Sequence, residues 1–340
     1  TASDAVANNY FGVSVAISGD IIVVGASGFY DSHVWSSSRA GAAYVFRTTD
    51  GGSTWSQTAK LTATDAAGGD GFGWSVAAAD NLIIIGAPYD DIEGGSGGWQ
   101  SGTGSAYMYE TTDGGNSWTE VYKLMQDDAG TKKWEFGISV LIHGDLCVVG
   151  CREHTGLGSG SAYVFRTSDG GVTWPQVAKL KGSDTGRHGY FGVALAAIGD
   201  RIIVGAPRWS SGKGKLYIYH TADSGSSWTQ ETTIAKSSSG EFFGSSLSIA
   251  GDVMVVGNNK DNRHQDVAGS NVGAAYVFRT SDDGATWTEE VKLTGSDRSD
   301  SDYFGSGVAL AGDLVAVGSF KASGPGEVYI FGFPVPTPRP

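Results

Sequence analysis

The sequence predicts an all-β fold, a six-bladed β-propeller with four antiparallel strands per blade. Three observations support this: a Phe-Gly pair recurs along the chain, each pair opens the same succession of short apolar stretches, and 53 of the 340 residues are Gly. Recurring units of this kind are typical of repeat architectures, and many short strands joined by tight turns are typical of propellers. The pairs begin at Phe11, Phe72, Phe136, Phe191, Phe243 and Phe304. We expect one propeller domain over residues 1–333 and a Pro-rich linker or tail over residues 334–340.

Each repeat shows the same order of elements. A short apolar stretch follows the Phe-Gly pair and ends in a Gly-Asp turn, which is Asp80-Asn81 in the second repeat. Small or αL-tolerant residues at such a point are typical of a two-residue hairpin. The next stretch, such as residues 21–25, is apolar almost throughout and suits a strand buried on both faces. A loop of variable length, a third strand and a more polar fourth strand follow, so we expect the fourth strand to face water.

Five repeats carry a further turn between strands three and four, running from Thr48 to Trp55 in the first repeat. An Asp carboxylate can accept backbone N–H bonds within such a turn, Gly supplies positive φ, and Trp can pack beneath it. We therefore expect these Asp and Trp residues to be structural, not catalysts or metal ligands. The pairs are Asp50 and Trp55, Asp113 and Trp118, Asp169 and Trp174, Asp223 and Trp228, and Asp282 and Trp287.

The sixth repeat lacks this turn and a fourth strand of its own. Residues 1–4, Thr-Ala-Ser-Asp, match residues 62–65, Thr-Ala-Thr-Asp, which end the first repeat. We predict that the N-terminal segment lies beside residues 328–331, completes the last blade and closes the ring. Closing the ring in this way would remove the free sheet edges.

The charge balance restricts the class of partner. The chain has 36 acidic and 23 basic residues, a formal net charge of −13. Phosphate binding needs clustered Lys and Arg, so we expect no nucleic-acid partner. The sequence holds no apolar run of about 18 residues, so we expect no direct membrane insertion. Cys147 and Cys151 lie four residues apart on one predicted strand, roughly 13 Å from each other, too far for a disulfide, so we expect two free, buried thiols.

The Phe-Gly pair, Gly-Ala-Pro at residues 86–88 and 205–207, and the Tyr-Val-Phe third strand together resemble the FG-GAP repeat of the integrin α-subunit propeller and of some fungal lectins. The resemblance implies an extracellular or cell-surface recognition or adhesion module. Integrin-type blades often carry a calcium loop between strands one and two, but here only Gly-Asp remains, so we expect those calcium sites to be absent.

The turns that end in Trp are similar to the Asp-box of sialidases. Sialidases need an arginine cluster, a Tyr nucleophile and an Arg-Ile-Pro motif, and this chain has no Arg-Ile-Pro. Its repeated arginines, Arg47, Arg166 and Arg279, directly precede the turns, where we do not expect them to converge. A sialidase-like glycoside hydrolase is kept as an alternative function.

We find no catalytic motif. The histidines lack zinc-site spacing, and no phosphate-binding loop is present. No cofactor is expected to be required. Calcium is left open at Asp90, Asp91 and Glu93, although this acidic segment lacks the regular alternation of a calcium loop, which favours a solvated loop.

The loops between strands two and three vary while the scaffold repeats, and in a propeller they emerge on one face. Binding sites on repeat proteins are usually built on such loops. The candidate ligand-binding residues there are Tyr30, Trp35, Tyr89, Trp99, Arg208 and Trp209. The aromatic rings among them either stack on a glycan or anchor a protein partner, or they fold back over their own loops. We predict a non-catalytic binding module, a monomeric domain of a larger protein, with a structural spacer as a further alternative.

Overall fold

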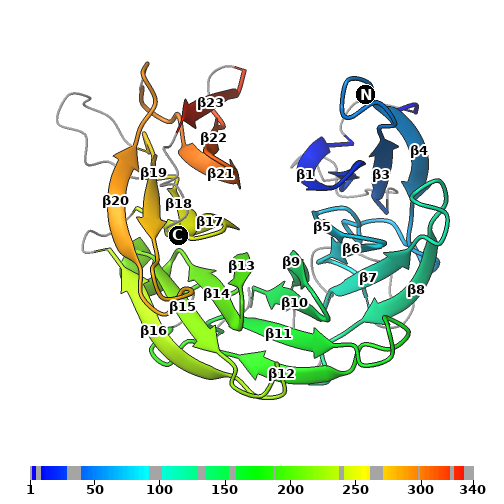
Figure 1. The fold of residues 1–340 in the computed structure, drawn as a ribbon, viewed down its shortest axis with the longest axis horizontal. Helices are drawn as coiled ribbons and strands as arrows, with labels where there is room; N and C mark the ends of the chain where they lie inside the picture. The colour runs from blue at the N-terminus through cyan, green and yellow to red at the C-terminus, as the bar shows by residue number, and fades with distance from the viewer. Residues whose placement is uncertain are drawn as a thin grey trace, which may run out of the picture. The chain divides into compact units, whose positions relative to one another are not determined.

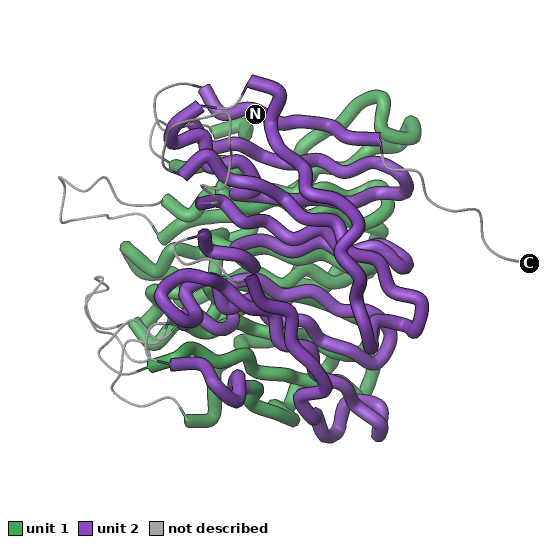
Figure 2. Tube along the Cα trace, turned by 90° about the vertical axis from the view of Figure 1, so that its left-hand side faces the viewer, with its two compact units in different colours: residues 1–180 green, residues 181–340 purple. Residues whose placement is uncertain are grey.

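The computed structural model divides the chain into two compact units, residues 1–180 and residues 181–340, coloured green and purple in Figure 2. The structure describes residues 2–4, 9–28, 40–91, 102–128, 135–152, 158–186, 189–236, 241–260, 271–297, 299–321 and 325–332. The Pro-rich tail lies outside these residues, and the expectation of one closed domain stays a prediction. Within the described part of the chain, no helix is long and apolar enough to cross a membrane.

The first unit holds three blades, each a four-stranded antiparallel sheet in which consecutive strands are neighbours (Figure 1). Blade 1 comprises β1 (Phe11–Ser18), β2 (Ile21–Ala26), β3 (Ala42–Arg47) and β4 (Ser56–Leu61). Blade 2 comprises β5 (Ser75–Ala79), β6 (Leu82–Ala87), β7 (Ser105–Glu110) and β8 (Thr119–Leu124). Blade 3 comprises β9 (Phe136–His143), β10 (Leu146–Cys151), β11 (Ser161–Arg166) and β12 (Gln176–Leu180).

The second unit holds the other three blades. Blade 4 comprises β13 (Ala194–Ile198), β14 (Arg201–Ala206), β15 (Lys215–His220) and β16 (Thr229–Ala235), with the short helix α1 (Trp209–Gly212) after β14. Blade 5 comprises β17 (Phe243–Ala250), β18 (Val253–Asn258), β19 (Ala274–Arg279) and β20 (Thr288–Leu293). Blade 6 comprises β21 (Phe304–Ala311), β22 (Leu314–Ser319) and β23 (Glu327–Gly332), three strands among its described residues. The all-β, six-bladed propeller fold class is confirmed.

The second strand forms the core of blades 1 to 5, whereas β22 of blade 6 is buried only at alternate residues. Strands β10 and β18 are buried along their whole length, and β6 and β14 are buried at all but the first residue. These strands are rich in Val and Ile, whose β-branched side chains favour the extended backbone. The fourth strands are only partly buried, as β20 shows. The expected contrast between a buried inner strand and a solvated outer strand is therefore confirmed.

The Phe-Gly pair packs one blade against the next. Phe72 is buried, and its ring contacts Tyr107 and Tyr109 of its own blade at centroid distances of 5.5 and 6.1 Å, in a core cluster that also holds Val23 and Val45 of blade 1. A Cβ on Gly86, at the end of β6, would lie 2.0 Å from the carbonyl oxygen of Gly137 in the next Phe-Gly pair. Blades 2 and 3 can approach this closely only because both residues are Gly. This contact explains why both glycines recur in register.

The cysteines and the repeated arginines lie where the sequence predicts. Cys147 and Cys151 are free and buried in β10, and burial raises the pKa of the Cys147 thiol. Arg47 Nε donates to Asp20 Oδ2 at 3.0 Å, and Arg166 Nε donates to Asp145 Oδ2 at 2.8 Å. Each of these arginines thus pairs with the Asp of the Gly-Asp hairpin in its own blade, at the outer end of the sheet.

The N-terminal segment behaves as the sequence match predicts, in its contacts with blade 1. Asp4 accepts a hydrogen bond from Tyr44 Oη at 2.7 Å, just as Asp65 accepts one from Tyr107 Oη at 2.9 Å in blade 2. Residues 2–4 therefore take the place, relative to blade 1, that residues 63–65 take relative to blade 2. Their pairing with β23, and hence closure of the ring, stays a prediction.

Candidate functional site

Each blade has two ends. We call the end with the strand two–three loop the loop end; it also carries the segment before strand one. The opposite end, with the Gly-Asp hairpin and the turn between strands three and four, is the turn end. Because consecutive strands are antiparallel, the segment that follows strand four also lies at the loop end. The candidate ligand-binding residues belong to the loop end.

The same backbone hydrogen bond fixes the loop end in five blades. In blade 2 the N–H of Tyr89 donates to the carbonyl oxygen of Asp70, two residues before Phe72, at 3.1 Å. Gly71, which lies between Asp70 and Phe72 in the sequence, has a φ of +71°. The equivalent bonds run from Gly28 to Asn9 at 3.2 Å, Arg208 to Gly189 at 3.1 Å, Lys260 to Glu241 at 3.0 Å and Lys321 to Asp302 at 3.1 Å. The donor is Gly, Tyr, Arg, Lys or Lys, so the backbone stays constant while the side chain it presents changes.

A cluster of Asp, Tyr and Lys also recurs at the loop end. In blade 1, Tyr44 of β3 donates to Asp4, Lys60 of β4 forms an ion pair with the same carboxylate, and Lys60 Nζ lies 5.5 Å from the centre of the Tyr44 ring. The bonds from Lys60 and Tyr44 lower the pKa of Asp4. The same Tyr-to-Asp bond joins Tyr107 to Asp65, Tyr163 to Asp128, Tyr217 to Asp184 and Tyr329 to Asp297. The cluster fastens the segment after one strand four to strand three of the next blade.

Blade 2 adds a second carboxylate to its cluster. Asp90, buried directly after Tyr89, accepts a hydrogen bond from Tyr107 Oη at 3.0 Å and pairs with Lys123 Nζ at 2.8 Å. Lys123 also pairs with Asp65 at 2.6 Å. Burial alone would lower the pKa of Lys123, but its bonds to the two carboxylates raise it. One Lys–Tyr pair therefore holds two carboxylates.

Asp70 is an unusual carboxyl group at the same loop end. Its side chain is buried, and its Oδ1 has no hydrogen-bond partner among the described residues, while Oδ2 accepts the N–H of Ala67 at 2.6 Å. Burial raises its pKa to about 7, opposed by the Ala67 bond and reinforced by the nearby charges of Asp90 and Asp91. The blade 2 loop end thus concentrates negative charge around a single Lys.

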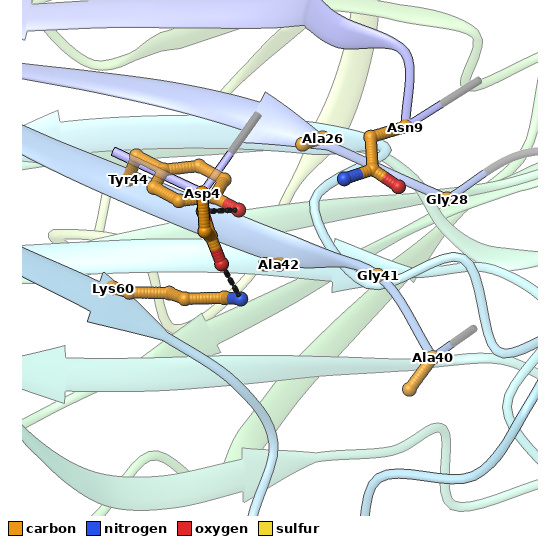
Figure 3. Close-up of a pocket in the computed structure, with 9 residues that line it drawn as sticks. All are labelled: Asp4, Asn9, Ala26, Gly28, Ala40, Gly41, Ala42, Tyr44 and Lys60. Atoms are coloured by element: carbon orange, nitrogen blue, oxygen red, sulfur yellow. Dashed lines mark hydrogen bonds and ion pairs between the residues drawn. The ribbon is translucent and has the colours of Figure 1, made fainter. Parts of the chain in front are cut away.

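Blade 1 has a pocket of about 250 Å³ at its loop end (Figure 3). Gly28 stands at the repeat position of Tyr89, and Asn9 stands at that of Asp70. Gly28 therefore brings no side chain to the pocket that it lines. The lining residues are Asp4, Asn9, Ala26, Gly28, Ala40, Gly41, Ala42, Tyr44 and Lys60. The pocket therefore combines an ammonium group, a phenol, an amide and a carboxylate on small apolar walls.

In the second unit, cations and aromatic rings alternate along the loop ends of blades 4 and 5. The Arg208 guanidinium lies 4.7 Å from the centre of the Tyr190 ring and 5.6 Å from that of Phe242, and Lys260 Nζ lies 4.4 Å from Phe242. Arg208 also donates to Tyr190 Oη at 2.7 Å. We call Tyr190, Arg208, Phe242 and Lys260 the cation–aromatic row. It holds two positive charges in fixed positions on a chain whose net charge is −13.

The turn end repeats almost without change. In blade 1, Asp50 Oδ1 accepts the N–H of Thr54 at 2.8 Å and the hydroxyl of Thr48 at 2.8 Å, and Asp50 Oδ2 accepts the Thr54 hydroxyl at 2.6 Å. These bonds lower the pKa of Asp50 to about 2. The pKa is also about 2 at Asp113, Asp169, Asp223 and Asp282. Carboxylates held this way stay ionised and support their own turns.

A family model described as the FG-GAP repeat matches the chain over residues 1–46, 55–109, 118–165, 174–219, 228–278 and 287–331. The inner matches run from strand four of one blade to strand three of the next. The chain belongs to the FG-GAP repeat family. No curated protein matches it.

The turns that end in Trp lie outside the FG-GAP matches. The five matches after the first begin at the Trp of a turn, as at Trp55, and the five matches before the last end ahead of the next turn, as at residue 109. The matches omit residues 47–54, 110–117, 166–173, 220–227 and 279–286, which contain the five Asp residues. The turns are thus additions to the family repeat, and their likeness to the sialidase Asp-box stays a prediction.

Three of the six predicted ligand-binding residues can be placed on the FG-GAP blades. Tyr89 is buried, with its ring edge-on to Trp74 at 5.7 Å, so it is not an exposed stacking surface. Arg208 is exposed in the cation–aromatic row. Trp209 folds back over its own blade: its Nε1 donates to the Asp184 carbonyl at 3.2 Å, and Lys215 Nζ lies 4.5 Å from its ring. Tyr30, Trp35 and Trp99 lie outside the described residues.

The acidic segment proposed for calcium is already engaged. Asp90 pairs with Lys123, and Asp91 lies beside the buried Asp70. Glu93 lies outside the described residues. In the described part of the FG-GAP chain, no group of three or more His, Cys, Asp or Glu side chains is placed to hold a metal ion. Calcium binding at Asp90, Asp91 and Glu93 stays an untested prediction.

Sequence reasoning missed the Asp–Tyr–Lys clusters, although the repeats carry their signal. An Asp follows the last Leu of strand four by four residues at Asp65, Asp128, Asp184 and Asp297. A Lys directly precedes that Leu at Lys60, Lys123, Lys179 and Lys292. Reading these positions together across the FG-GAP repeats would have placed a charged cluster at the loop ends of blades 1 to 3. In blades 4 and 6 the Lys comes from other positions, Lys215 and Lys321.

Proposed function

We propose that the chain is a non-catalytic recognition module, outside the cell or at its surface, that binds a glycan or protein partner at the loop ends of its blades. One observation carries this proposal: a single backbone-fixed position presents Gly28, Tyr89, Arg208, Lys260 and Lys321 in different blades. A constant frame that offers changing chemistry is the usual construction of a binding surface on a repeat protein.

The cation–aromatic row is the strongest exposed feature at these loop ends. Arg208 is exposed, and Tyr190 and Phe242 remain partly exposed beside it. Arg and Tyr are enriched among the residues that dominate binding energy, because they combine a large contact area with fixed polar groups. Contact with the two neighbouring rings limits the movement of Arg208, which lowers the entropy lost when it binds a partner. The FG-GAP propeller fold also fits a surface recognition or structural module.

The carboxyl groups argue against a glycoside hydrolase of the kind that works with a carboxyl pair. Such an enzyme needs two accessible carboxyl groups, one protonated and one ionised, on either side of the scissile bond, whereas a sialidase uses a Tyr nucleophile and is addressed by the glycosidase screen below. Asp70 has the raised pKa of a general acid, but only 2% of it is exposed, so a substrate cannot reach it. The Asp residues of the turns are accessible but have a pKa of about 2 and are bound within their own turns. Recognition therefore explains these residues better than hydrolysis.

A glycan array, a panel of immobilised extracellular proteins and a parallel glycosidase screen test the proposal. We expect binding without turnover. Arg208→Ala should weaken binding at least tenfold, since a hot-spot contact contributes about 2 kcal/mol and 1.4 kcal/mol is tenfold. Arg47→Ala is the matched control, because Arg47 pairs with Asp20 at the turn end. Turnover of a glycoside, or equal loss of binding in both variants with unchanged melting temperatures, would overturn the proposal.

A further inference from the structure

Two blades use the same device to hold a pair of carboxylates. In blade 2, Lys123 and Tyr107 bind both Asp65 and Asp90. In blade 6, Lys321 pairs with Asp297 at 3.2 Å and with Glu327 at 2.8 Å, and Tyr329 bonds to both of these carboxylates.

The second carboxylate and the Lys both come from different elements in the two blades. Asp90 follows Tyr89 in the loop after β6 and pairs with Lys123 of β8, whereas Glu327 begins β23 and pairs with Lys321, which stands at the repeat position of Tyr89. An ammonium group has three donors and a phenol has one, so Lys supplies most of these bonds and Tyr shares its proton. The Tyr of strand three and a neighbouring Lys therefore hold two carboxylates in either arrangement.

Blade 1 keeps the Lys–Tyr pair but fills the second place differently. Lys60 and Tyr44 bind Asp4, which carries the only carboxylate among the described residues that line the pocket. The repeat position of Asp90 is Phe29, which lies outside the described residues, and that of Glu327 is Ala42. A pocket of about 250 Å³ lies beside Lys60 and Tyr44 (Figure 3).

The charges around the blade 1 pocket are also more favourable to an incoming anion than the charges around the blade 2 cluster. Asn9 replaces Asp70, which removes the carboxyl group whose pKa burial and neighbouring charges raise to about 7. The Lys60 side chain is 42% exposed, against 24% for Lys123. Lys60 can therefore be reached from solvent, and a new carboxylate meets one fewer negative charge.

We infer that the blade 1 pocket binds the carboxylate of a small polar ligand, held by Lys60 and Tyr44 in the place that Asp90 fills in blade 2. This inference rests on the proposed recognition role of the loop ends and names the ligand chemistry of one of them. The small walls at Ala26, Gly41 and Ala42 admit a compact molecule. Two sources fit this chemistry, a sugar acid and an acidic amino acid.

Calorimetry with matched acid and neutral probes separates these sources. D-glucuronate is compared with D-glucose, and N-acetylaspartate with N-acetylasparagine. We expect one acid of the two to bind at a single site, at least tenfold more tightly than its neutral partner. Lys60→Met should abolish this binding. Lys179→Met, in the Asp128 cluster of blade 3, should leave it unchanged. If neither acid binds the unmodified chain, the inference is wrong, and that result needs no variant.

A gain-of-site variant gives an independent test. Tyr89→Gly, Asp90→Ala and Asp70→Asn together recreate the blade 1 arrangement of Gly28 and Asn9 in blade 2, and Lys123 remains paired with Asp65. We expect the stoichiometry for the bound acid to rise from one to two, with a folded chain confirmed by circular dichroism. A folded triple variant that still binds one equivalent would contradict the role given to the Lys–Tyr pair. The two proposals can fail separately. If Arg208→Ala removes binding on the array but no acid binds in blade 1, this inference is refuted and the proposed recognition role remains.

Discussion

In blade 2, Asp113 at the turn end and Asp70 at the loop end have pKa values shifted in opposite directions. At the turn end, Asp50 and its four counterparts have a pKa of about 2, because each carboxylate accepts bonds from its own turn. At the loop end, burial raises the pKa of Asp70 to about 7, whereas bonds from Lys and Tyr lower the pKa of Asp4 and Asp65. Ionisation of Asp70 therefore opposes folding, unlike that of Asp4 and Asp65. Strongly shifted groups of this kind are often found at functional sites, which agrees with the binding role proposed for the loop end.

The ends also differ in what is allowed to vary. The turn end repeats both its backbone and its side chains, whereas the loop end repeats its backbone and its Tyr-to-Asp bond but changes the side chain at the position of Tyr89. If this contrast is correct, the loop-end backbone should tolerate change poorly even though its side chains differ between blades.

A glycine pair tests that expectation and should give the largest effect. Gly104, at the loop end, has a φ of +82°, and a Cβ there would lie 2.1 Å from the Phe136 carbonyl oxygen. Gly104→Ala should lower the free energy of unfolding by about 4 kcal/mol, from backbone strain and overpacking together. Gly144 has a φ of +60° at the turn end and open space around it, so Gly144→Ala should cost about 1 kcal/mol. Equal losses in urea unfolding would remove the contrast.

The fold was predictable from sequence because packing imposes the same demands on every repeat. The Phe72-Gly73 pair and the Gly86 near the end of β6 recur in six repeats, and the turn around Asp113 recurs in five, so the copies reinforce one another. The buried second strands and the free cysteines followed from the same local patterns.

The candidate site was predictable only in part, because its residues depart from the repeat. Asp4, Tyr44 and Lys60 come from three separate segments, and only the folded sheet brings them together. Tyr89 looked like an exposed ring, but it packs over Gly71 and against Trp74. Sequence alone does not predict whether an aromatic side chain in a variable loop is buried, since its burial depends on the space left by glycines that are distant in the sequence.

The second prediction uses the raised pKa of Asp70. The folded-state pKa of about 7 lies above the ordinary value of 3.8, so the folded chain binds more protons between these values and loses stability as pH rises through them. Asp70→Asn removes this loss and should stabilise the chain by about 2 kcal/mol at pH 8, with no gain at pH 4. A pKa shift of about three units corresponds to about 1.4 kcal/mol per unit. The expected gain in stability is smaller than this, because the buried amide of Asn also needs hydrogen-bond partners. Asn9 at the same position in blade 1 shows that the amide fits the repeat.

Asp65→Asn is the control for that measurement. Burial alone would raise the pKa of Asp65, but the bonds from Lys123 and Tyr107 lower it, so its ionised form stabilises the fold. Asp65→Asn should therefore destabilise the chain at pH 8. If both variants shift the unfolding midpoint in the same direction at pH 8, burial and charge at this loop end do not act as described.

The last and smallest effect is expected at the turn end, in acid. The pKa of Asp169 is lowered from 3.8 to about 2 by the hydroxyl and N–H of Thr173, so its stabilising contribution is complete above pH 4 and is lost as pH falls toward 2. Asp169→Asn should lower the melting temperature at pH 6 and approach the unmodified chain at pH 2 to 3. Thr173→Ala keeps the backbone bond and loses the hydroxyl, so it should show a smaller loss with the same pH trend. Neither variant touches the loop end, so ligand binding should be unchanged in both. If Asp169→Asn remains folded but no longer binds the ligand, the two ends of the blade are coupled. The division between a structural end and a binding end would then fail.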